Sequence, residues 1–386
     1  MIPYGRQSIN EDDINSVVKV LRSSFLTQGE MVPFFESELN SRFNSKYCVA
    51  MNSATSALHA SYLALGIAKG DLVWTVPNTF VATSNAALSA GAIIDFVDID
   101  KNTLNIDVKK LEAKLIEADR NNNLPKVVTP VHLTGLPCDM PKIKELSSHY
   151  GFKILEDASH AVGAKILSSH IGECKYSDIT VFSFHPVKII TTAEGGAALT
   201  QSQEIADKLQ IYRSHGITKD ETKFLNVSNG PWYYEQMELG FNYRLTDIQA
   251  ALGISQLSRI EEFVEKRKSI ACWYDTKLKN KKIKRPVFIN GFESSWHLYV
   301  IQLTDEYIKY HKKLFVSLQQ NGLGVQLHYM PVHLQPFYRK FGFKEGDYPV
   351  SEKYAKRAIS IPIYPNLTKA EQKLVVDKIN MSLKDL

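Results

Sequence analysis

The sequence predicts an α/β fold in which a mostly parallel sheet is covered by helices, followed by a smaller C-terminal α+β domain. Two observations carry this prediction. Between residues 47 and 156, short apolar segments alternate with helical patterns, and such alternation is typical of crossover connections between parallel strands. After about residue 260 the alternation stops, and short segments of both kinds follow in no regular order. We therefore expect a large domain over residues 1–260, including an N-terminal arm, and a small domain over residues 261–386.

The N-terminal region precedes the alternating part and predicts two helices. Residues 11–21 place apolar side chains at helical spacing, and acidic residues occupy the first turn, where the helix dipole favours negative charge. Residues 26–29 interrupt the pattern, and a second helix is expected over 33–43. The first strand of the sheet follows at residues 47–51.

The alternating part supplies the rest of the large sheet. We expect strands at 72–76, 93–97, 127–131, 152–156, 178–184 and 197–200, with helices at 53–65, 79–90, 108–118 and 141–150. The longest helical pattern, residues 247–268, leads into the small domain. There, residues 277–285 are basic and predict an exposed connection, and the remaining elements are expected at 296–303, 311–320, 325–329 and 358–363.

Composition narrows the class of protein without identifying it. The chain has 386 residues, 44% of them hydrophobic and 23% charged, which is ordinary for a globular protein. The net charge of +5 suits a substrate with a diphosphate. The basic stretch at 277–285 is expected to be a connection and not a binding patch, and no face combines basic and aromatic residues, which argues against a nucleic-acid partner. Four scattered cysteines without a Cys-x-x-Cys pair favour a reducing compartment. With no signal-like N-terminus and no long apolar run, we expect a cytoplasmic protein without a membrane partner.

Lys188 lies on a connection between two segments that read as buried strands. Pro186 ends the first segment, and Gly195 and Gly196 open the second. A lysine at such a place has two interpretations. It is either a solvated loop lysine, which is the common case, or a desolvated amine able to form a Schiff base with a carbonyl cofactor. Lys188 by itself leaves both open.

Asp157 changes that balance. It follows the apolar strand at 152–156, and the carboxyl end of a parallel strand is where open α/β sheets bind ligands. Pyridoxal phosphate chemistry requires a lysine for the imine and a carboxylate for the pyridinium nitrogen. Asp157 precedes Lys188 with one strand-like segment between them. The pair, in this order, therefore indicates pyridoxal 5′-phosphate more strongly than either residue does.

A turn rich in small hydroxyl residues, 52–58, lies between the first strand and the following helix. Free backbone N–H groups and the positive end of the helix dipole make such a turn able to bind phosphate. Ser53 or Thr55 could equally act as a simple N-cap, so both interpretations stay open. The chain contains no Gly-x-Gly-x-x-Gly and no Walker-type loop, which argues against dinucleotide and nucleoside-triphosphate sites.

Four motifs together resemble those of the DegT/DnrJ/EryC1/StrS nucleotide-sugar aminotransferases: residues 52–58, 156–160, 183–196 and 240–244. The resemblance runs through nearly the whole chain and implies a fold-type I transferase dependent on pyridoxal 5′-phosphate. It makes Lys188 and Asp157 the catalytic residues. It implies cofactor contacts from Ala54, Thr55, Phe80, Asp157, His160, Ser183, Lys188 and Asn242.

The resemblance also implies a role for each cofactor contact. Phe80 would stack on the pyridine ring, and His160 would bond its phenolic oxygen. Ala54, Thr55 and Ser183 would bind the phosphate. Asn242 would reach the cofactor phosphate of a neighbouring subunit, which makes the site composite and a homodimer obligatory.

The implied reaction is transfer of an amine from L-glutamate to C4 of a UDP-linked 4-keto-6-deoxy amino sugar of L-arabino configuration. The segments similar to substrate-binding parts of the family comprise Tyr4, Ser24, Phe25, Leu26, Thr27, Ala54, Ser183, Asn242, Gln326, Leu327, His328 and Tyr329. Two alternatives stay open: amino transfer to another 4-keto nucleotide sugar, such as the D-xylo epimer, and a homologue that binds the cofactor without turnover.

Two further features are candidates for other roles, a pair of histidines for metal binding and an aromatic segment for a flap. His328 and His333 flank Pro331 and therefore cannot share a helical face as paired metal ligands would, so no metal site is expected. The Trp232–Tyr234 segment follows Pro231 in a polar region. It is either a mobile flap over the nucleotide or a local aromatic cluster, and the sequence does not decide between them.

Overall fold

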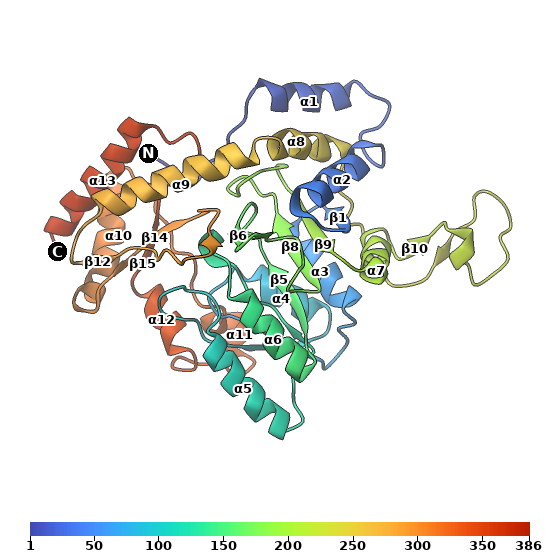
Figure 1. Cartoon of the computed structure of the whole chain (residues 1–386), viewed down its shortest axis with the longest axis horizontal. Coiled ribbons are helices and arrows are strands. Elements are labelled where there is room, and N and C mark those ends of the chain that lie inside the picture. The colour runs from blue at the N-terminus through green and yellow to red at the C-terminus, as the bar shows by residue number, and fades with distance from the viewer.

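The computed structural model describes residues 1–386, and a seven-stranded sheet lies at its centre (Figure 1). The strand order is β1-β9-β8-β5-β4-β2-β3. Strands β3, β2, β4, β5 and β8 pair in parallel, whereas β9 runs antiparallel to both β8 and β1. The bounds are β1 Tyr47–Met51, β2 Leu72–Thr75, β3 Ile93–Phe96, β4 Val127–Val128, β5 Lys153–Asp157, β8 Ile179–Ser183 and β9 Gly196–Thr200. The predicted mostly parallel, helix-covered sheet is confirmed.

Helices cover both faces of this sheet and form two separate cores. One core contains α2 Met31–Phe43, α5 Val108–Arg120, α6 Met140–Tyr150 and α8 Asp247–Leu257, and the other contains α3 Ala54–Ala64, α4 Ala82–Ser89 and α7 Gln203–Arg213. Side chains of one strand alternate between the cores, so Ile154 joins the first and Leu155 the second. Asp157 therefore points to the layer that contains α3 and α4.

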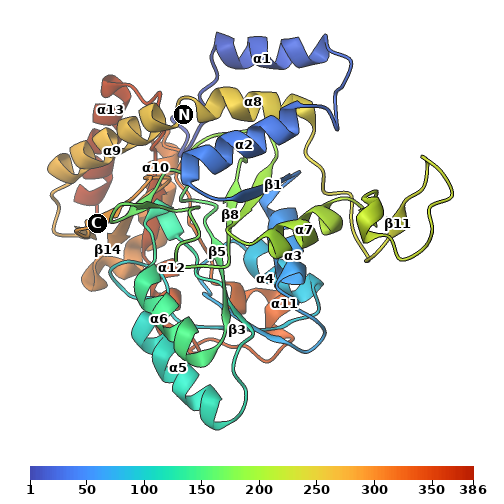
Figure 2. The same ribbon diagram turned by 45° about the vertical axis from the view of Figure 1, so that its right-hand side comes forward.

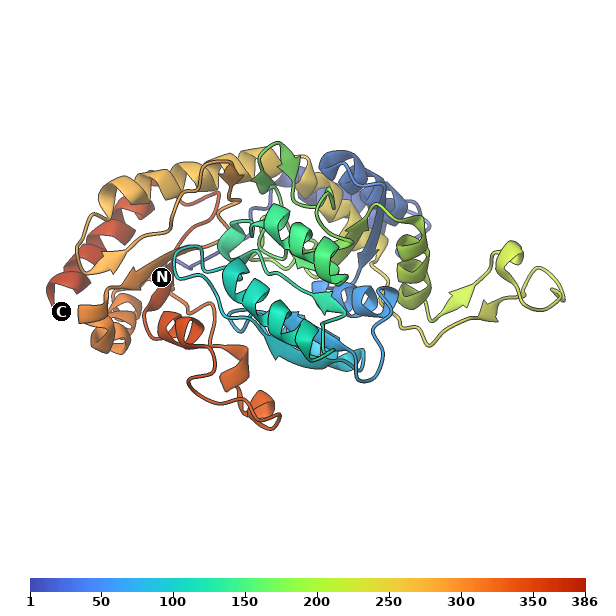
Figure 3. The same ribbon diagram turned by 60° about the horizontal axis from the view of Figure 1, so that its bottom comes forward.

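The part of the chain after α9 contains a second sheet, with the strand order β12-β14-β15 (Figure 3). It packs with α10 and α13 around its own core, in which the side chains of residues 270–383 gather. The bounds are α9 Ile260–Lys277, β12 Ile283–Lys284, β14 Tyr299–Leu303, α10 His311–Gln320, α11 Pro336–Arg339, α12 Pro349–Ala355, β15 Ala358–Ile361 and α13 Lys369–Lys384. The start of α9 packs in a core of the large sheet, and its end packs in the core of the small sheet. The predicted domain boundary at residue 260 therefore stays a prediction.

The remaining elements are short, apart from the N-terminal helix α1 Glu11–Leu21, which packs against α8. One small sheet joins β13 Phe292–Glu293, β6 Lys165–Ile166 and β7 Ser169–His170. A second hairpin, β10 Ile217–Thr218 with β11 Glu235–Gln236, projects away from the body (Figure 2). Short 3₁₀ helices lie at Leu133–Gly135, Glu221–Lys223, Asp305–Tyr310 and Val332–Leu334. None of the helices combines the length and the apolar character that crossing a bilayer requires.

The projecting hairpin contains the aromatic segment whose role the sequence left open. Tyr233 packs edge-on against Phe224, with ring centroids 5.1 Å apart, and its hydroxyl donates a hydrogen bond to Glu235 at 2.9 Å. Trp232 and Tyr234 are 74% and 53% exposed. Tyr233 thus belongs to a local cluster, while its two neighbours are free to contact another surface.

Three predicted elements differ from the observed ones. The helix expected over 247–268 is two helices, because Arg259 leaves the helical conformation (φ −107°) where its guanidinium pairs with Asp13 of α1. The element expected over 325–329 is neither a helix nor a strand, and it pairs by a single bridge, from Gln326 to Ser360. Three residues after Gln326, the backbone N–H of Tyr329 donates to the side chain of Asn78, which follows β2 of the seven-stranded sheet. The exposed connection expected over 277–285 contains strand β12.

Candidate active site

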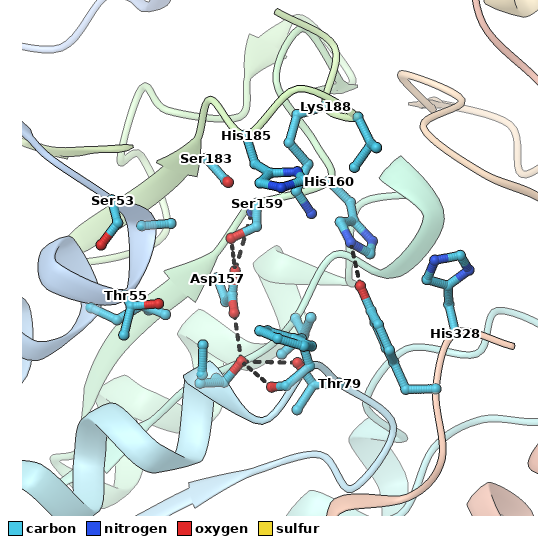
Figure 4. Close-up of a pocket in the computed structure, with 18 of the residues that line it drawn as sticks. Ser53, Thr55, Thr79, Asp157, Ser159, His160, Ser183, His185, Lys188 and His328 are labelled. Carbon is cyan, nitrogen blue, oxygen red and sulfur yellow. Dashed lines mark hydrogen bonds between the residues drawn. The ribbon is translucent and has the colours of Figure 1, made fainter. Parts of the chain in front are cut away.

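A cavity of about 450 Å³ lies at the carboxyl ends of β5 and β8 (Figure 4). Its volume falls within the range of small-molecule sites. The end of a parallel strand in an open sheet is the expected place for such a site. It brings together ten of the predicted residues: Tyr4, Ala54, Thr55, Phe80, Asp157, His160, Ser183, Lys188, His328 and Tyr329.

The sheet itself places Asp157 and Ser183 side by side. Strands β5 and β8 are parallel neighbours, with Asp157 opposite Val181 in the register. Because side chains alternate, Asp157, Val181 and Ser183 face the same layer. Ser183 is buried, and its hydroxyl forms no hydrogen bond within the protein. It is therefore available to a group bound in the cavity.

Asp157 is held by hydrogen bonds on both carboxylate oxygens. The Thr83 hydroxyl donates to Oδ2 at 2.6 Å. The backbone N–H and hydroxyl of Ser159 donate to Oδ1 at 3.1 and 2.6 Å. Hydrogen bonds to a charged acceptor are stronger than neutral ones, so these donors fix the carboxylate in one orientation. Asp157 is only 5% exposed.

The loop that bears Lys188 is closed at its base. The backbone N–H of Phe184 donates to the carbonyl of Gly195 at 2.9 Å. The carbonyl of Phe184 accepts from the backbone N–H of Thr192 at 3.0 Å. The Thr191 hydroxyl donates to the same carbonyl at 3.0 Å. These contacts join the ends of a loop of about ten residues into one rigid unit. Lys188 is presented to the cavity from this unit (Figure 4).

The amine of Lys188 loses most of its solvent within the cavity. Desolvation lowers its pKa to about 8, although the nearby charge of Asp157 acts in the opposite direction. The residue as a whole is half-buried, since part of it borders the open cavity. A pKa near 8 leaves a substantial fraction of the amine neutral at physiological pH, which both a nucleophile and a proton acceptor require.

The N-terminus of α3 forms the opposite end of the cavity. Ser53 is its N-cap, and its hydroxyl accepts from the N–H of Ser56 at 3.1 Å. The backbone N–H groups of Ala54 and Thr55 form no hydrogen bond inside the protein. Gly196 of β9 passes close by, and a Cβ there would lie 2.4 Å from the Ala54 nitrogen. Only glycine permits this approach, and the free N–H groups form a ready anion site.

His160 and Tyr329 form the wall of the cavity beside Lys188. The backbone N–H of Thr134 donates to His160 Nδ1 at 3.3 Å, so the other nitrogen, Nε2, carries the proton and donates to the Tyr329 hydroxyl at 3.1 Å. Burial, with the charge of Lys188, holds the pKa of His160 well below its usual value. His160 is therefore neutral. Its predicted bond to the cofactor's phenolic oxygen stays a prediction.

Phe80 covers the cavity from the α4 side. Its ring lies 5.9 Å from that of Tyr329 and is 58% exposed. An exposed aromatic at the mouth of a polar cavity is available for stacking on a planar ligand.

Several predicted residues lie outside this cavity. Ser24, Phe25, Leu26 and Thr27 form an exposed segment after α1, where the Leu26 carbonyl accepts from the N–H of Asp247 at 3.0 Å. Gln326 and Leu327 precede His328 without lining the cavity. Asn242 pairs with Ser214 near the base of the projecting hairpin. Their predicted roles stay predictions.

The family comparison now agrees with this geometry. Residues 7–380 match the DegT/DnrJ/EryC1/StrS aminotransferase family. The chain belongs to this family. The resemblance seen in the four motifs is thus confirmed over nearly the whole length. Aminotransferases of this family use pyridoxal 5′-phosphate, and a solved relative, a sugar aminotransferase of Streptococcus pneumoniae, is in its PLP form.

Individual relatives of this aminotransferase cover almost all of it. The chain is 40% identical over 380 residues to the UDP-4-amino-4,6-dideoxy-N-acetyl-β-L-altrosamine transaminase of Campylobacter jejuni, covering 98% of this chain and 96% of that protein. It is 36% identical over 382 residues to a spore coat polysaccharide biosynthesis protein of Bacillus subtilis, with the same two coverages. Its fold matches the Helicobacter pylori aminotransferase involved in pseudaminic acid biosynthesis with a TM-score of 0.91, at 30% identity and complete coverage of both chains.

The residues present fit the family's cofactor. The Ser183 hydroxyl, which has no partner within the protein, and the free N–H groups of α3 can donate to a phosphate. The oriented carboxylate of Asp157 suits a pyridinium nitrogen, and the Lys188 amine suits the aldehyde carbon. No group of three His, Cys, Asp or Glu side chains in the chain is arranged to hold a metal ion.

Sequence reasoning missed the residues that support Asp157. Ser159 had a local signal, since an aspartate often bonds the backbone two residues later. Thr83 had none, because it reaches Asp157 from α4, 74 positions away along the chain. His185 and Glu194, which also line the cavity from the lysine loop, were within a predicted motif but were not singled out.

Proposed function

We propose that this protein is a C4 aminotransferase for a UDP-linked 4-keto sugar. In this reaction UDP-2-acetamido-2,6-dideoxy-β-L-arabino-hex-4-ulose and L-glutamate give UDP-4-amino-4,6-dideoxy-N-acetyl-β-L-altrosamine and 2-oxoglutarate, a step of pseudaminic acid biosynthesis. The observation that carries the proposal is the presence of Lys188 and the oriented Asp157 in one cavity. The sugar is proposed from the Campylobacter jejuni and Helicobacter pylori relatives, whose names concern this chemistry.

The proposed mechanism uses two groups at the centre of the cavity. When bound, pyridoxal phosphate supplies an electron sink for the carbon that loses its proton. Lys188 Nζ removes the proton from Cα of L-glutamate in the first half-reaction and delivers one to C4 of the sugar in the second. Its pKa of about 8 suits both directions, because the amine is readily protonated and deprotonated near neutral pH. Asp157 keeps the ring nitrogen charged in both halves.

The remaining residues hold the reactants. Ser183 and the N–H groups of Ala54 and Thr55 orient the phosphate, and Phe80 covers the ring. Tyr4, His328 and Tyr329 line the outer cavity, where the sugar would lie beside Lys188. Holding reactants next to the amine is worth up to roughly 7–11 kcal/mol for well-oriented groups.

The proposal includes a homodimer with composite sites. Asn242 lies near the base of the projecting hairpin and does not line the cavity of its own chain, which supports a role in the cofactor site of a second subunit. The exposed Trp232 and Tyr234 on the same hairpin are consistent with a surface that another chain covers.

Direct product analysis tests this function. The purified protein, loaded with pyridoxal phosphate, is incubated with L-glutamate and the L-arabino sugar, and separately with its D-xylo epimer. Mass spectrometry and NMR then identify the product, with Lys188→Ala as the matched inactive control. Preferential formation of a C4 amine from the L-arabino substrate is the expected result. Preference for the epimer would overturn the sugar assignment, and no amine from either would overturn amino transfer to these sugars.

A further inference from the structure

A second cleft, separate from the Lys188 cavity, lies between the large sheet and the small one. Its volume is about 390 Å³, also within the range of small-molecule sites. We call it the interdomain cleft. Lys101 lines it from the loop after β3, Lys284 from β12 and Gln302 from β14. Helix α12 and the turn after it, visible in Figure 1, complete the lining with Lys353, Tyr354 and Arg357.

The interdomain cleft is strongly positive. Four basic residues line it, Lys101, Lys284, Lys353 and Arg357, against a single acidic residue, Asp305. Asp305 pairs with Arg357 and, at 3.0 Å, with Lys353. Lys101 and Lys284 have no carboxylate within salt-bridge distance. Since a cleft with low-dielectric walls concentrates the field of its charges, this arrangement attracts anions.

Two polar side chains of the cleft can donate to a ligand. Arg357 is 7% exposed, and its guanidinium lines the cleft while pairing with Asp305. Gln302 is 8% exposed, and its side-chain amide forms no hydrogen bond within the protein. An acceptor-rich ligand in the cleft would supply the Gln302 amide with a partner.

The interdomain cleft is connected to the catalytic cavity through one side chain. Tyr354 lines the cleft and is 2% exposed, and its hydroxyl donates to the backbone carbonyl of His328 at 2.7 Å. The imidazole of His328 lines the catalytic cavity. A ligand that displaces Tyr354 therefore acts on a residue beside the proposed substrate position.

From these observations we propose that the interdomain cleft binds a small molecule bearing a diphosphate, and that its occupancy is sensed at the catalytic cavity through Tyr354. A diphosphate supplies many acceptor oxygens for Arg357, Gln302 and the lysines. Arginine and lysine together are the usual partners of phosphate groups in proteins. A neutral ligand would leave Lys101 and Lys284 without any counter-charge. The sensing part of the proposal rests on the proposed aminotransferase activity, whereas the binding part does not.

Calorimetry with inorganic pyrophosphate tests the binding part on the cofactor-loaded protein. The double variant Lys101→Glu/Lys284→Glu reverses two exposed charges of the cleft without touching the catalytic cavity. The control Lys142→Glu/Lys373→Glu makes the same change of net charge at two exposed positions elsewhere. We expect the cleft variant to weaken pyrophosphate binding about tenfold or more and the control to leave it nearly unchanged. No measurable binding, or equal weakening by both variants, would overturn the proposal.

Kinetics tests the sensing part. Pyrophosphate is expected to change KM for the sugar nucleotide in the unmodified protein and in the Lys142→Glu/Lys373→Glu control, but not in the cleft variant. Tyr354→Phe removes the bond to His328 and is expected to bind pyrophosphate without the change in KM. If the cleft variant shows the same change in KM, pyrophosphate acts in the catalytic cavity and the sensing part is wrong. Failure of amino transfer itself would leave the calorimetric result intact, so the two proposals can be told apart.

Discussion

Replacing Thr83 by valine tests how the carboxylate of Asp157 is held. Within the protein, Oδ2 of Asp157 accepts one hydrogen bond, from Thr83 at 2.6 Å, while Oδ1 accepts two from Ser159. Valine keeps the volume but leaves Oδ2 without a donor on a residue that is 5% exposed. Hydrogen bonds to charged groups contribute about 1.5–3 kcal/mol. We expect Thr83→Val to lower the free energy of unfolding of the cofactor-free protein by about that amount, and kcat/KM by roughly ten- to hundredfold.

Two matched variants sharpen this experiment. Ser159→Ala removes one of two donors to Oδ1 and keeps the backbone N–H, so its cost is expected to be about half as large. Thr79→Val loses the 2.9 Å bond to Thr83 but leaves all donors to Asp157 in place. Urea unfolding of the cofactor-free proteins and steady-state kinetics of the loaded ones measure both effects. A Ser159→Ala cost equal to or above that of Thr83→Val, or a Thr79→Val cost that matches it, would refute the reasoning.

Four further outcomes are expected. Lys188→Ala should fold yet lack the visible absorption band of the lysine-bound cofactor; an unchanged spectrum would show that another residue holds it. Because the pKa of Lys188 is about 8, the neutral amine increases with pH up to that value. Cofactor capture by the cofactor-free protein, followed by absorbance, should therefore rise about tenfold per pH unit below pH 8 and level off above it, whereas a midpoint near 10.5 would contradict the desolvation. Gly196→Ala should weaken cofactor affinity in titrations, because its Cβ would lie 2.4 Å from the backbone nitrogen of Ala54 in α3. The control Gly5→Ala should leave the affinity unchanged, because the nearest atom to its Cβ would lie 3.7 Å away. Asp157→Ala should reduce kcat/KM more than Asn242→Ala, and equal modest losses would refute the role of the ring's charge partner.

Local patterns in the sequence were sufficient for the sheet and for the centre of the site. Asp157 and Lys188 could be predicted because each lies at the end of a short apolar segment, and the order of such segments fixes where a parallel sheet places them. The N-terminus of α3 could be predicted for the same reason, since hydroxyl residues before a helix mark a cap. These features depend on neighbours within a few positions along the chain.

Features that depend on distant contacts were out of reach. Nothing near Arg259 in the sequence shows that its pairing with Asp13, far away along the chain, ends one helix and begins another. The segment before Tyr329 pairs with β15 only at Gln326, and the backbone N–H of Tyr329 donates to the Asn78 side chain and not to a neighbouring strand. In both places a tertiary contact overrides a local preference.

In the lysine loop, the hydrogen bonds that hold the loop are made by other groups than the side chain that performs the chemistry. The bonds between Phe184, Thr192 and Gly195 involve backbone groups, and none of them uses the side chain of Lys188. The loop would therefore keep its shape whichever side chain stood at position 188. Such a site can acquire a different reaction through one substitution at position 188, while the sheet, the loop and the contacts that other residues make to the cofactor remain those of the original protein.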